Sequence, residues 1–526
     1  MRTLMQLALV LLAPLTPAIA LAQNTASQPT PPTTPAPPTP PTPAPPAPPA
    51  EPEARGEQAS SFALVLDPSA HKSPFTGRVY LVFSTSHTGE PRRQMGGWFG
   101  KTQVIAADVK DIAPGTPISF GDNDLGWPAS PKDIPAGEYT VQAVARVNLD
   151  SPSPGKGEGD LYSKPLRVHF DRNVPTLLAT RLTLSETVSA RPFRETDRVK
   201  LFEIKSPSLS AFLGRDRSIR AGVVLPKDWS ADNARHYPTL IWIPGFGGDH
   251  NGAATMARMM GQVGDDCLII VPDPSCFRGH SVFADSANNG PWGKALTTEL
   301  IPAIESKYHG ATDSDHRFVS GMSSGGWSSL WLQISYPDFF GGVWSHCPDP
   351  VDFRDFQRIN LYEPALNMYK DQEGNRRPIA RSGDTPTLFV DAFVAQESIM
   401  GPGGQIHAFE AVFSPRLPDG SPRPIFNRAT GAIDAATAKA WEPYDIRLKL
   451  EREWPTLAPK LKGKLHIYAG EKDTFYLDGA AIRLKDALKS LGSDATVDII
   501  PGMPHTIHQP GIKAMLEEIK KCTMAK

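Results

Sequence analysis

The chain has 526 residues, more than one hydrophobic core usually organises, so two folded domains with additional tails are expected. Hydrophobic residues make up 40% of the sequence, enough to bury a sizeable core. The formal net charge is −2, and no segment forms the basic surface that nucleic-acid binding needs. Nucleic-acid-binding proteins are thereby excluded, and an anionic substrate would need a local cluster of positive side chains.

Residues 1–22 have the features of a secretory signal peptide. Arg2 supplies the positive charge, residues 4–15 are mostly apolar, and Ala20-Leu21-Ala22 before Gln23 is a typical cleavage site. A membrane anchor is the alternative, but the apolar stretch is short for a span. We expect an exported protein, periplasmic or secreted, without a membrane span.

Residues 23–59 predict a Pro-rich disordered linker, because Pro, Ala and Thr alone cannot bury a core. Residues 60–171 then show apolar side chains at alternate positions in short runs separated by Gly and Pro. This pattern predicts an all-β, Ig-like sandwich that serves as an accessory domain. Residues 172–205 are expected to connect it to the next domain.

Residues 206–526 combine short, solidly apolar runs with segments of helical periodicity. Buried strands that alternate with helices predict an α/β domain with a mostly parallel sheet, whose ligands bind at the carboxyl ends of the strands. The expected strands are 240–243, 268–271, 318–319, 465–468 and 497–500, and the expected helices are 294–307, 327–335, 478–491 and 512–521.

The segment Gly321-Met322-Ser323-Ser324-Gly325 matches the G-x-S-x-G nucleophile elbow. The chain must turn sharply from strand to helix there, and small flanking residues avoid a clash. The serine hydroxyl then lies at a helix N-terminus, where developing negative charge is favoured. Ser323 is the predicted nucleophile, and a Gly-rich turn without chemistry is the alternative.

A nucleophilic serine needs a base and an acid that orients the base. Asp473 follows the strand predicted at 465–468, with Glu471 and Asp478 as rivals for the acid. His505 follows the last predicted strand, with His508 as the rival base. The order Ser, Asp, His is the one this fold uses.

An oxyanion hole needs two backbone N–H donors. One is expected from Ser324, directly after the nucleophile. The other is expected from Phe246, with Gly247 second, in the Gly-rich loop after the strand at 240–243. An ordinary glycine turn is the alternative for that loop.

Arg278, His280 and Trp292 are candidates for the substrate pocket, where they could bind an anionic or aromatic group. Packing within loops is the favoured alternative for all three. His505 and His508 could instead bind a metal, but no carboxylate-rich motif accompanies them, so no metal site is predicted.

Four cysteines are present, and export would permit disulfides. Three connectivities are possible and the sequence does not choose among them. A bridge between Cys276 and Cys347 is mildly preferred because both follow expected strand ends, and free buried thiols are the alternative.

The stretch from residue 206 to the C-terminus resembles the Putative esterase family of α/β hydrolases, which includes esterase D and enterochelin esterase. The motifs that carry the resemblance are 220–226, Pro244-Gly245-Phe246-Gly247-Gly248, Gly279-His280-Ser281, 289–293, the elbow, 470–473 and Pro504-His505. The resemblance covers about three-fifths of the chain. It implies carboxylic-ester hydrolysis without metal or cofactor, with an oxyanion donor at Phe246.

The chain departs from the family in two places. Most relatives have histidine where Pro244 stands. Residues 348–459 form a long insertion that is expected to be a lid or a side wall over the site.

The resulting hypothesis is an exported serine esterase that cleaves carboxylic esters through a Ser-His-Asp triad and an acyl-enzyme. Its substrate would be a small-molecule or polysaccharide-linked ester. A serine peptidase, an acyltransferase and a catalytically inactive surface-binding protein are the alternatives.

Overall fold

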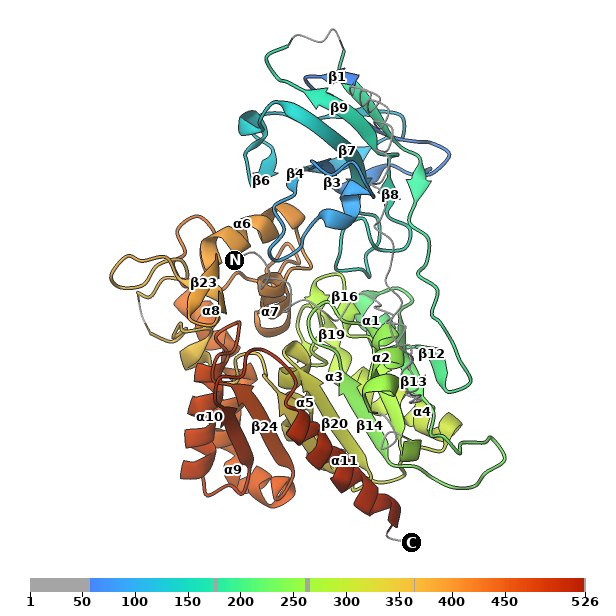
Figure 1. Ribbon diagram of the computed structural model, residues 1–526, viewed down its shortest axis with the longest axis vertical. Coiled ribbons are helices and arrows are strands. Elements are labelled where there is room, and N and C mark those ends of the chain that lie inside the picture. The colour runs from blue at the N-terminus through green and yellow to red at the C-terminus, as the bar shows by residue number, and fades with distance from the viewer. Residues whose placement is uncertain (1–56, 175–177, 261–264, 364, 525–526) are drawn as a thin grey trace, which may run out of the picture. The chain divides into compact units, whose positions relative to one another are not determined.

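The computed structural model describes residues 57–174, 178–260, 265–363 and 365–524 (Figure 1). The predicted signal peptide (1–22) and the predicted linker (23–59) lie outside these residues, except for 57–59, which form strand β1 (Glu57–Ala59). Among the described residues, no helix combines the length and apolar character that a membrane span requires.

The first part of the chain consists of two β-sheets that share one hydrophobic core. Strands β2 (Phe62–Leu66) and β3 (Phe75–Ser84) direct alternate side chains into that core, and those of Leu64 and Leu81 are fully buried. Phe83 packs edge-on against both Phe62 and Tyr139, with ring centroids 5.5 and 5.6 Å apart. Two sheets over one core form the predicted β-sandwich.

The larger sheet has the order β1–β9–β7–β3–β4–β6, and β8 pairs with both β7 and β11. The smaller sheet has the order β10–β2–β5. The strand bounds are β2 Phe62–Leu66, β3 Phe75–Ser84, β4 Gln103–Ile112, β5 Pro117–Ser119, β6 Leu125–Trp127, β7 Gly137–Ala145, β8 Leu161–Tyr162, β9 Leu166–Phe170, β10 Thr180–Leu184 and β11 Glu186–Thr187.

The segment 172–205, predicted as a connector, contributes strands to both parts. β10 pairs with β2 and β11 pairs with β8 in the sandwich. β12 (Val199–Lys205) is the first strand of the next sheet. The sequence did not predict these short strands, because the sequence around them is polar and their pairing partners lie far away in the chain.

The second part is built on an eight-stranded sheet of order β12–β13–β15–β14–β20–β21–β24–β25. The first two strands are antiparallel to their neighbours, and all pairs from β15 onward are parallel. This mostly parallel sheet confirms the predicted α/β-hydrolase fold. Its further strands are β13 Ser218–Val224, β14 Thr239–Ile243, β15 Leu268–Pro272, β20 Arg317–Met322, β21 Gly342–His346, β24 Leu465–Gly470 and β25 Thr496–Ile500.

The helices between these strands present apolar faces to the sheet. The predicted helix 294–307 is observed as α3 (Trp292–Ala295), a π-helical turn (Leu296–Leu300) and α4 (Ile301–Tyr308). The other main helices are α1 Pro207–Leu213, α2 Ala253–Met259, α5 Ser324–Ser335, α10 Asp478–Ser490 and α11 Gln509–Met524.

The predicted insertion, 348–459, is folded rather than an open loop. It contains a hairpin, β22 (Pro378–Ser382) and β23 (Thr385–Phe389), and the helices α6 (Val390–Met400), α7 (Gln405–Phe413) and α8 (Ala435–Trp441). The predicted boundary falls inside α9 (Ile446–Leu461), which packs against α5 and α10.

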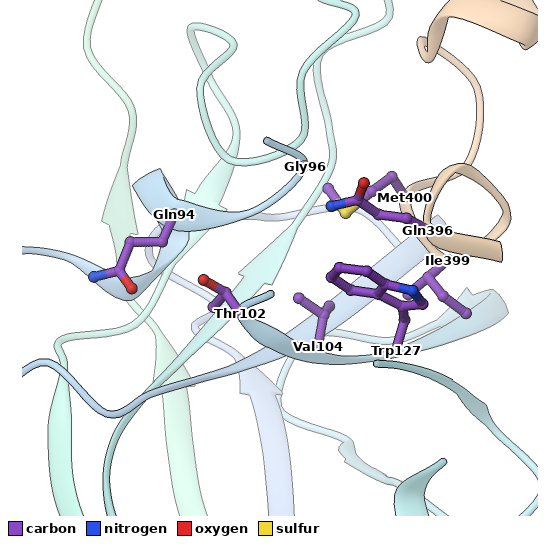
Figure 2. Close-up of a pocket in the computed structure, with 8 residues that line it drawn as sticks. All are labelled: Gln94, Gly96, Thr102, Val104, Trp127, Gln396, Ile399 and Met400. Carbon is purple, nitrogen blue, oxygen red and sulfur yellow. The ribbon is translucent and has the colours of Figure 1, made fainter. Parts of the chain in front are cut away.

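Helix α6 of the insertion lies beside β4 and β6 of the sandwich (Figure 1). Helix α6 and the sandwich face each other across a hollow, shown in Figure 2. It is lined by Gln94, Gly96, Thr102, Val104, Trp127, Gln396, Ile399 and Met400. The sandwich and the insertion are therefore in direct contact.

Candidate active site

Ser323 lies in a strained turn between β20 and α5, with φ 61° and ψ −125°. Glycines on both sides allow this turn. A Cβ at Gly321 would lie 2.3 Å from the carbonyl oxygen of Gly325, and a Cβ at Gly325 would lie 2.1 Å from that of Ile243. Only glycine fits at either position, so the motif folds as the predicted elbow. Its serine is partly exposed at the start of α5.

The structure brings His505 and Asp473 together at the carboxyl ends of the last two strands. Nδ1 of His505 lies 2.7 Å from Oδ2 of Asp473. The other carboxylate oxygen accepts the backbone N–H of Phe475 at 2.8 Å and of Leu477 at 3.4 Å. Asp473 is fully buried, and the side chain of His505 is 9% exposed. The two backbone bonds fix the carboxylate, and the bond to Nδ1 fixes the orientation of the imidazole ring.

The rival residues have other partners. Glu471 is exposed and accepts the backbone N–H of Gly502. Asp478 forms ion pairs with Arg358 and Arg381. The ring of His508 packs on Tyr468, and its backbone N–H points to Nδ1 of the His346 side chain.

The pair of His505 and Asp473 is electrostatically coupled. Burial alone would lower the pKa of His505, but the charge of Asp473 and hydrogen bonds with Asp473 and Cys347 raise this pKa well above its usual value. Burial would raise the pKa of Asp473, but the charge and hydrogen bond of His505 hold it below its usual value. Asp473 is therefore suited to stabilise an imidazolium.

The loop predicted to supply the second oxyanion donor lies directly beside Ser323. A Cβ at Gly245 would lie 3.4 Å from Cβ of Ser323, which places the adjacent Phe246 at the elbow. Ser324 is the first residue of α5, so its N–H belongs to the helix N-terminus. The two predicted donors thus belong to two segments that meet at Ser323.

His280 is buried and forms a hydrogen bond with the start of that loop. Its Nδ1 accepts the backbone N–H of Val282 at 3.0 Å, so the ring proton is on Nε2, which donates to the carbonyl of Pro244 at 2.9 Å. Burial lowers the pKa of His280 to about 4. A neutral imidazole therefore fixes the residue that precedes Gly245.

The other two predicted pocket residues are held by loop carbonyls. Trp292 is buried, and its indole N–H donates to the carbonyl of Asn289 at 3.0 Å. Arg278 donates to the carbonyls of Asn288 and Gly420. The structure does not bring either side chain into contact with Ser323.

Asp349 is a second carboxylate near Ser323, and the sequence motifs do not single it out. It accepts the hydroxyl of Ser324 at 2.5 Å, and Oγ of Ser323 lies 3.4 Å from it. Nε2 of Gln405, at the start of α7, lies 3.3 Å from the same carboxylate. Asp349 is 3% exposed, and burial raises its pKa to about 6. Its position just after β21, as Asp473 follows β24, was the available signal.

Cys347, also just after β21, lies against the histidine. Its thiol donates to the carbonyl of Thr506 at 3.3 Å, and potential ligand atoms of Cys347, Asp473 and His505 lie within 4.8 Å of one another. Nδ1 of His505 and Oδ2 of Asp473 already serve each other, and the thiol serves the carbonyl of Thr506, so the three side chains form one hydrogen-bonded cluster. The preferred Cys276–Cys347 bridge is wrong, because all four cysteines are free; Cys347 faces the histidine loop instead.

Comparisons with known proteins match the second part of the chain. It is similar to the fluorophosphonate-binding serine hydrolase FphF of Staphylococcus aureus, with 14% identity and a TM-score of 0.38 over 62% of this chain and 98% of that chain. An S-formylglutathione hydrolase from Agrobacterium tumefaciens shows 14% identity and a TM-score of 0.37 over 61% and 94%. A ferulic acid esterase from Anaeromyces mucronatus shows 13% identity and a TM-score of 0.31 over 62% and 91%.

The model of one protein family matches residues 210–486, which is more than half of the chain and includes the elbow and Asp473. That family is described as "Putative esterase". The chain belongs to this esterase family.

Proposed function

We propose that this protein is an exported serine esterase that hydrolyses carboxylic esters through Ser323, His505 and Asp473. One observation carries the proposal: a serine in a strained strand-to-helix turn lies at the same sheet edge as a buried, hydrogen-bonded His505–Asp473 pair. Membership of the esterase family supports ester hydrolysis as the reaction.

In the proposed acylation step, Oγ of Ser323 attacks the ester carbonyl carbon and its proton passes to Nε2 of His505. The backbone N–H groups of Phe246 and Ser324 stabilise the oxyanion. The intermediate collapses, the carbon–oxygen bond to the alcohol breaks, and the imidazolium returns the proton to the leaving oxygen. Asp473 stabilises the imidazolium throughout.

In deacylation, water attacks the acyl carbon while His505 accepts its proton. The intermediate collapses, the bond from that carbon to Oγ of Ser323 breaks, and the imidazolium returns the proton to Oγ as the acid is released. The Ser323 hydroxyl has its hydrogen bond with Asp349 in the free protein. The hydroxyl therefore has to exchange this hydrogen bond for one to Nε2 of His505 before proton transfer.

Hydrolysis of p-nitrophenyl acetate by wild type and Ser323→Ala tests the proposal. We expect activity in wild type, loss of it in Ser323→Ala, and covalent labelling of wild type alone by a fluorophosphonate. Ser490→Ala is the matched control, because Ser490 is exposed at the end of α10 and should retain full activity. Equal rates in wild type and Ser323→Ala would overturn the assignment of the nucleophile.

The proposal of export rests on the predicted signal peptide. We expect the mature protein to begin at Gln23, which N-terminal sequencing of protein from the native host would test. An intact N-terminus on cytosolic protein would contradict export without affecting the proposed chemistry.

A further inference from the structure

Polar side chains of the sandwich form hydrogen bonds with the end of α6 and with the turn between α6 and α7. Arg78 donates to the carbonyls of Ser398 and Ile399 at 2.6 and 3.1 Å, and Tyr80 donates to the carbonyl of Met400 at 2.7 Å. Arg146 donates to the carbonyl of Pro402. The last carbonyls of a helix have no partners within it and attract positive charge, so these contacts stabilise the end of α6.

This turn leads directly into α7, whose first residue lies beside the elbow. Helix α7 begins at Gln405, whose side chain lies 3.3 Å from both the Ser324 hydroxyl and the Asp349 carboxylate. Glu397 of α6 accepts the backbone N–H of Ile406 at 3.0 Å and ties the two helices together. Fixing the end of α6 therefore fixes Gln405 beside the elbow.

A second contact leads from the sandwich to the histidine. Trp98 lies in the sandwich loop that follows the short helix at Pro91–Gln94. Its ring packs between Phe393 of α6, at a centroid distance of 4.4 Å, and Phe475, at 5.0 Å. Phe475 lies edge-on to the imidazole of His505 at 4.9 Å. One aromatic ring thus separates the indole from the imidazole.

We infer that the sandwich domain is part of the catalytic unit and that Trp98 is a positioning residue, which holds His505 through Phe475. The inference rests on the proposed function. The imidazole must keep Nδ1 on Asp473 while Nε2 reaches Ser323, and small displacements of such groups are costly. Without the indole, Phe475 loses one of its two ring partners and water gains access to the imidazole.

The charged and titratable groups near His505 determine how its pKa responds. Asp473 and Cys347 hydrogen-bond with it, and the carboxylate of Asp349 interacts with it electrostatically. Water would weaken both the burial penalty and the attraction to Asp473. The pKa of His505 should then fall toward its ordinary value, which a loss of stability alone would not cause.

The test compares Trp98→Ala, Trp98→Phe and Phe99→Ala. We expect Trp98→Ala to lose up to about 100-fold in kcat for p-nitrophenyl acetate, with KM within about twofold and the acid limb of the pH profile shifted toward 6.5. Trp98→Phe should restore most of kcat because it keeps a ring against Phe475. Phe99→Ala is the matched control, because Phe99 is the next residue and is 45% exposed.

Wild-type kcat and an unshifted acid limb in Trp98→Ala would overturn the inference, as would a loss of kcat that Trp98→Phe does not restore. An NMR titration of His505 in the Ser323→Ala background needs no turnover. In this titration, a lower pKa of His505 with Trp98→Ala supports the positioning role. If wild type also cleaves no ester, only the proposed function fails. An unchanged pKa there refutes the positioning role whatever the esterase activity.

Discussion

Substituting Asp473 by asparagine changes one atom of the proposed triad and leaves its shape intact. In wild type, one carboxylate oxygen accepts two backbone N–H groups and the other lies 2.7 Å from Nδ1 of His505. Asparagine would keep its oxygen on the backbone donors, because its NH₂ group cannot accept them. The NH₂ group then faces His505, so Nδ1 must accept and the ring proton moves to Nε2. That tautomer cannot take the proton of Ser323.

The loss should be large and confined to the chemical step. The same substitution in a serine protease triad lowers kcat about 10⁴-fold, which corresponds to about 5.4 kcal/mol of transition-state stabilisation at 1.36 kcal/mol for each factor of ten. We expect a loss of about 10³- to 10⁴-fold in kcat for Asp473→Asn, with KM little changed. Steady-state hydrolysis of p-nitrophenyl acetate and the rate of fluorophosphonate labelling measure it.

Glu471→Gln is the matched control, since Glu471 lies in the same loop but is exposed and bonds only to the backbone of Gly502. It should keep kcat within about threefold of wild type, as surface changes away from the site usually do little. An Asp473→Asn protein that is folded and retains more than about a tenth of wild-type kcat would refute the tautomer argument.

Three further predictions follow from the site. Since proton transfer needs neutral His505 and its pKa is raised, kcat/KM should rise with pH with a midpoint above 6.5; a midpoint below 6 in a pH–rate profile would contradict this. The pKa of Asp349 is about 6 in the folded protein against about 3.9 in the unfolded chain, so the folded state binds this proton more tightly. The free energy of unfolding should therefore fall by about 3 kcal/mol as the pH rises from below about 3.9 to above about 6. Asp349→Asn should therefore raise Tm at pH 8 but not at pH 4, and calorimetry showing a lower Tm at pH 8 would speak against it. His280→Phe should free the carbonyl of Pro244 and lower kcat by less than the roughly 100- to 1,000-fold cost of losing an oxyanion donor; unchanged kcat would show that the loop does not depend on His280.

Local pattern predicted much of the fold and of the site. Strands such as 240–243 and 465–468 were predicted because solid apolar runs must be buried on both sides, and they form β14 and β24. The elbow was predicted because only small residues can flank Ser323, and its backbone angles are those of such a turn. The positions of Asp473 and His505 followed from their places just after strands of one parallel sheet.

Contacts between distant segments were not predictable in this way. The short strands at 180–184 and 199–205 fall in the predicted connector, because their pairing partners, not their own residues, define them. Asp349 falls in the predicted lid region, because its place just after a strand end is the one local signal, and that signal alone does not tell a carboxylate at Ser323 from one in solvent. The preferred disulfide assumed that two strand ends meet, but Cys347 faces His505.

The sequence by itself determined the class of fold, the nucleophile elbow and the order of the proposed triad, because each depends on residue types at short, fixed spacings. The tertiary structure alone decided that Asp473, not Glu471, binds His505, and that Asp349 contacts Ser323. It also decided that Trp98, hundreds of positions away, lies one ring from His505. These contacts join elements that are far apart in the chain, and only the packing of the folded domains brings them together.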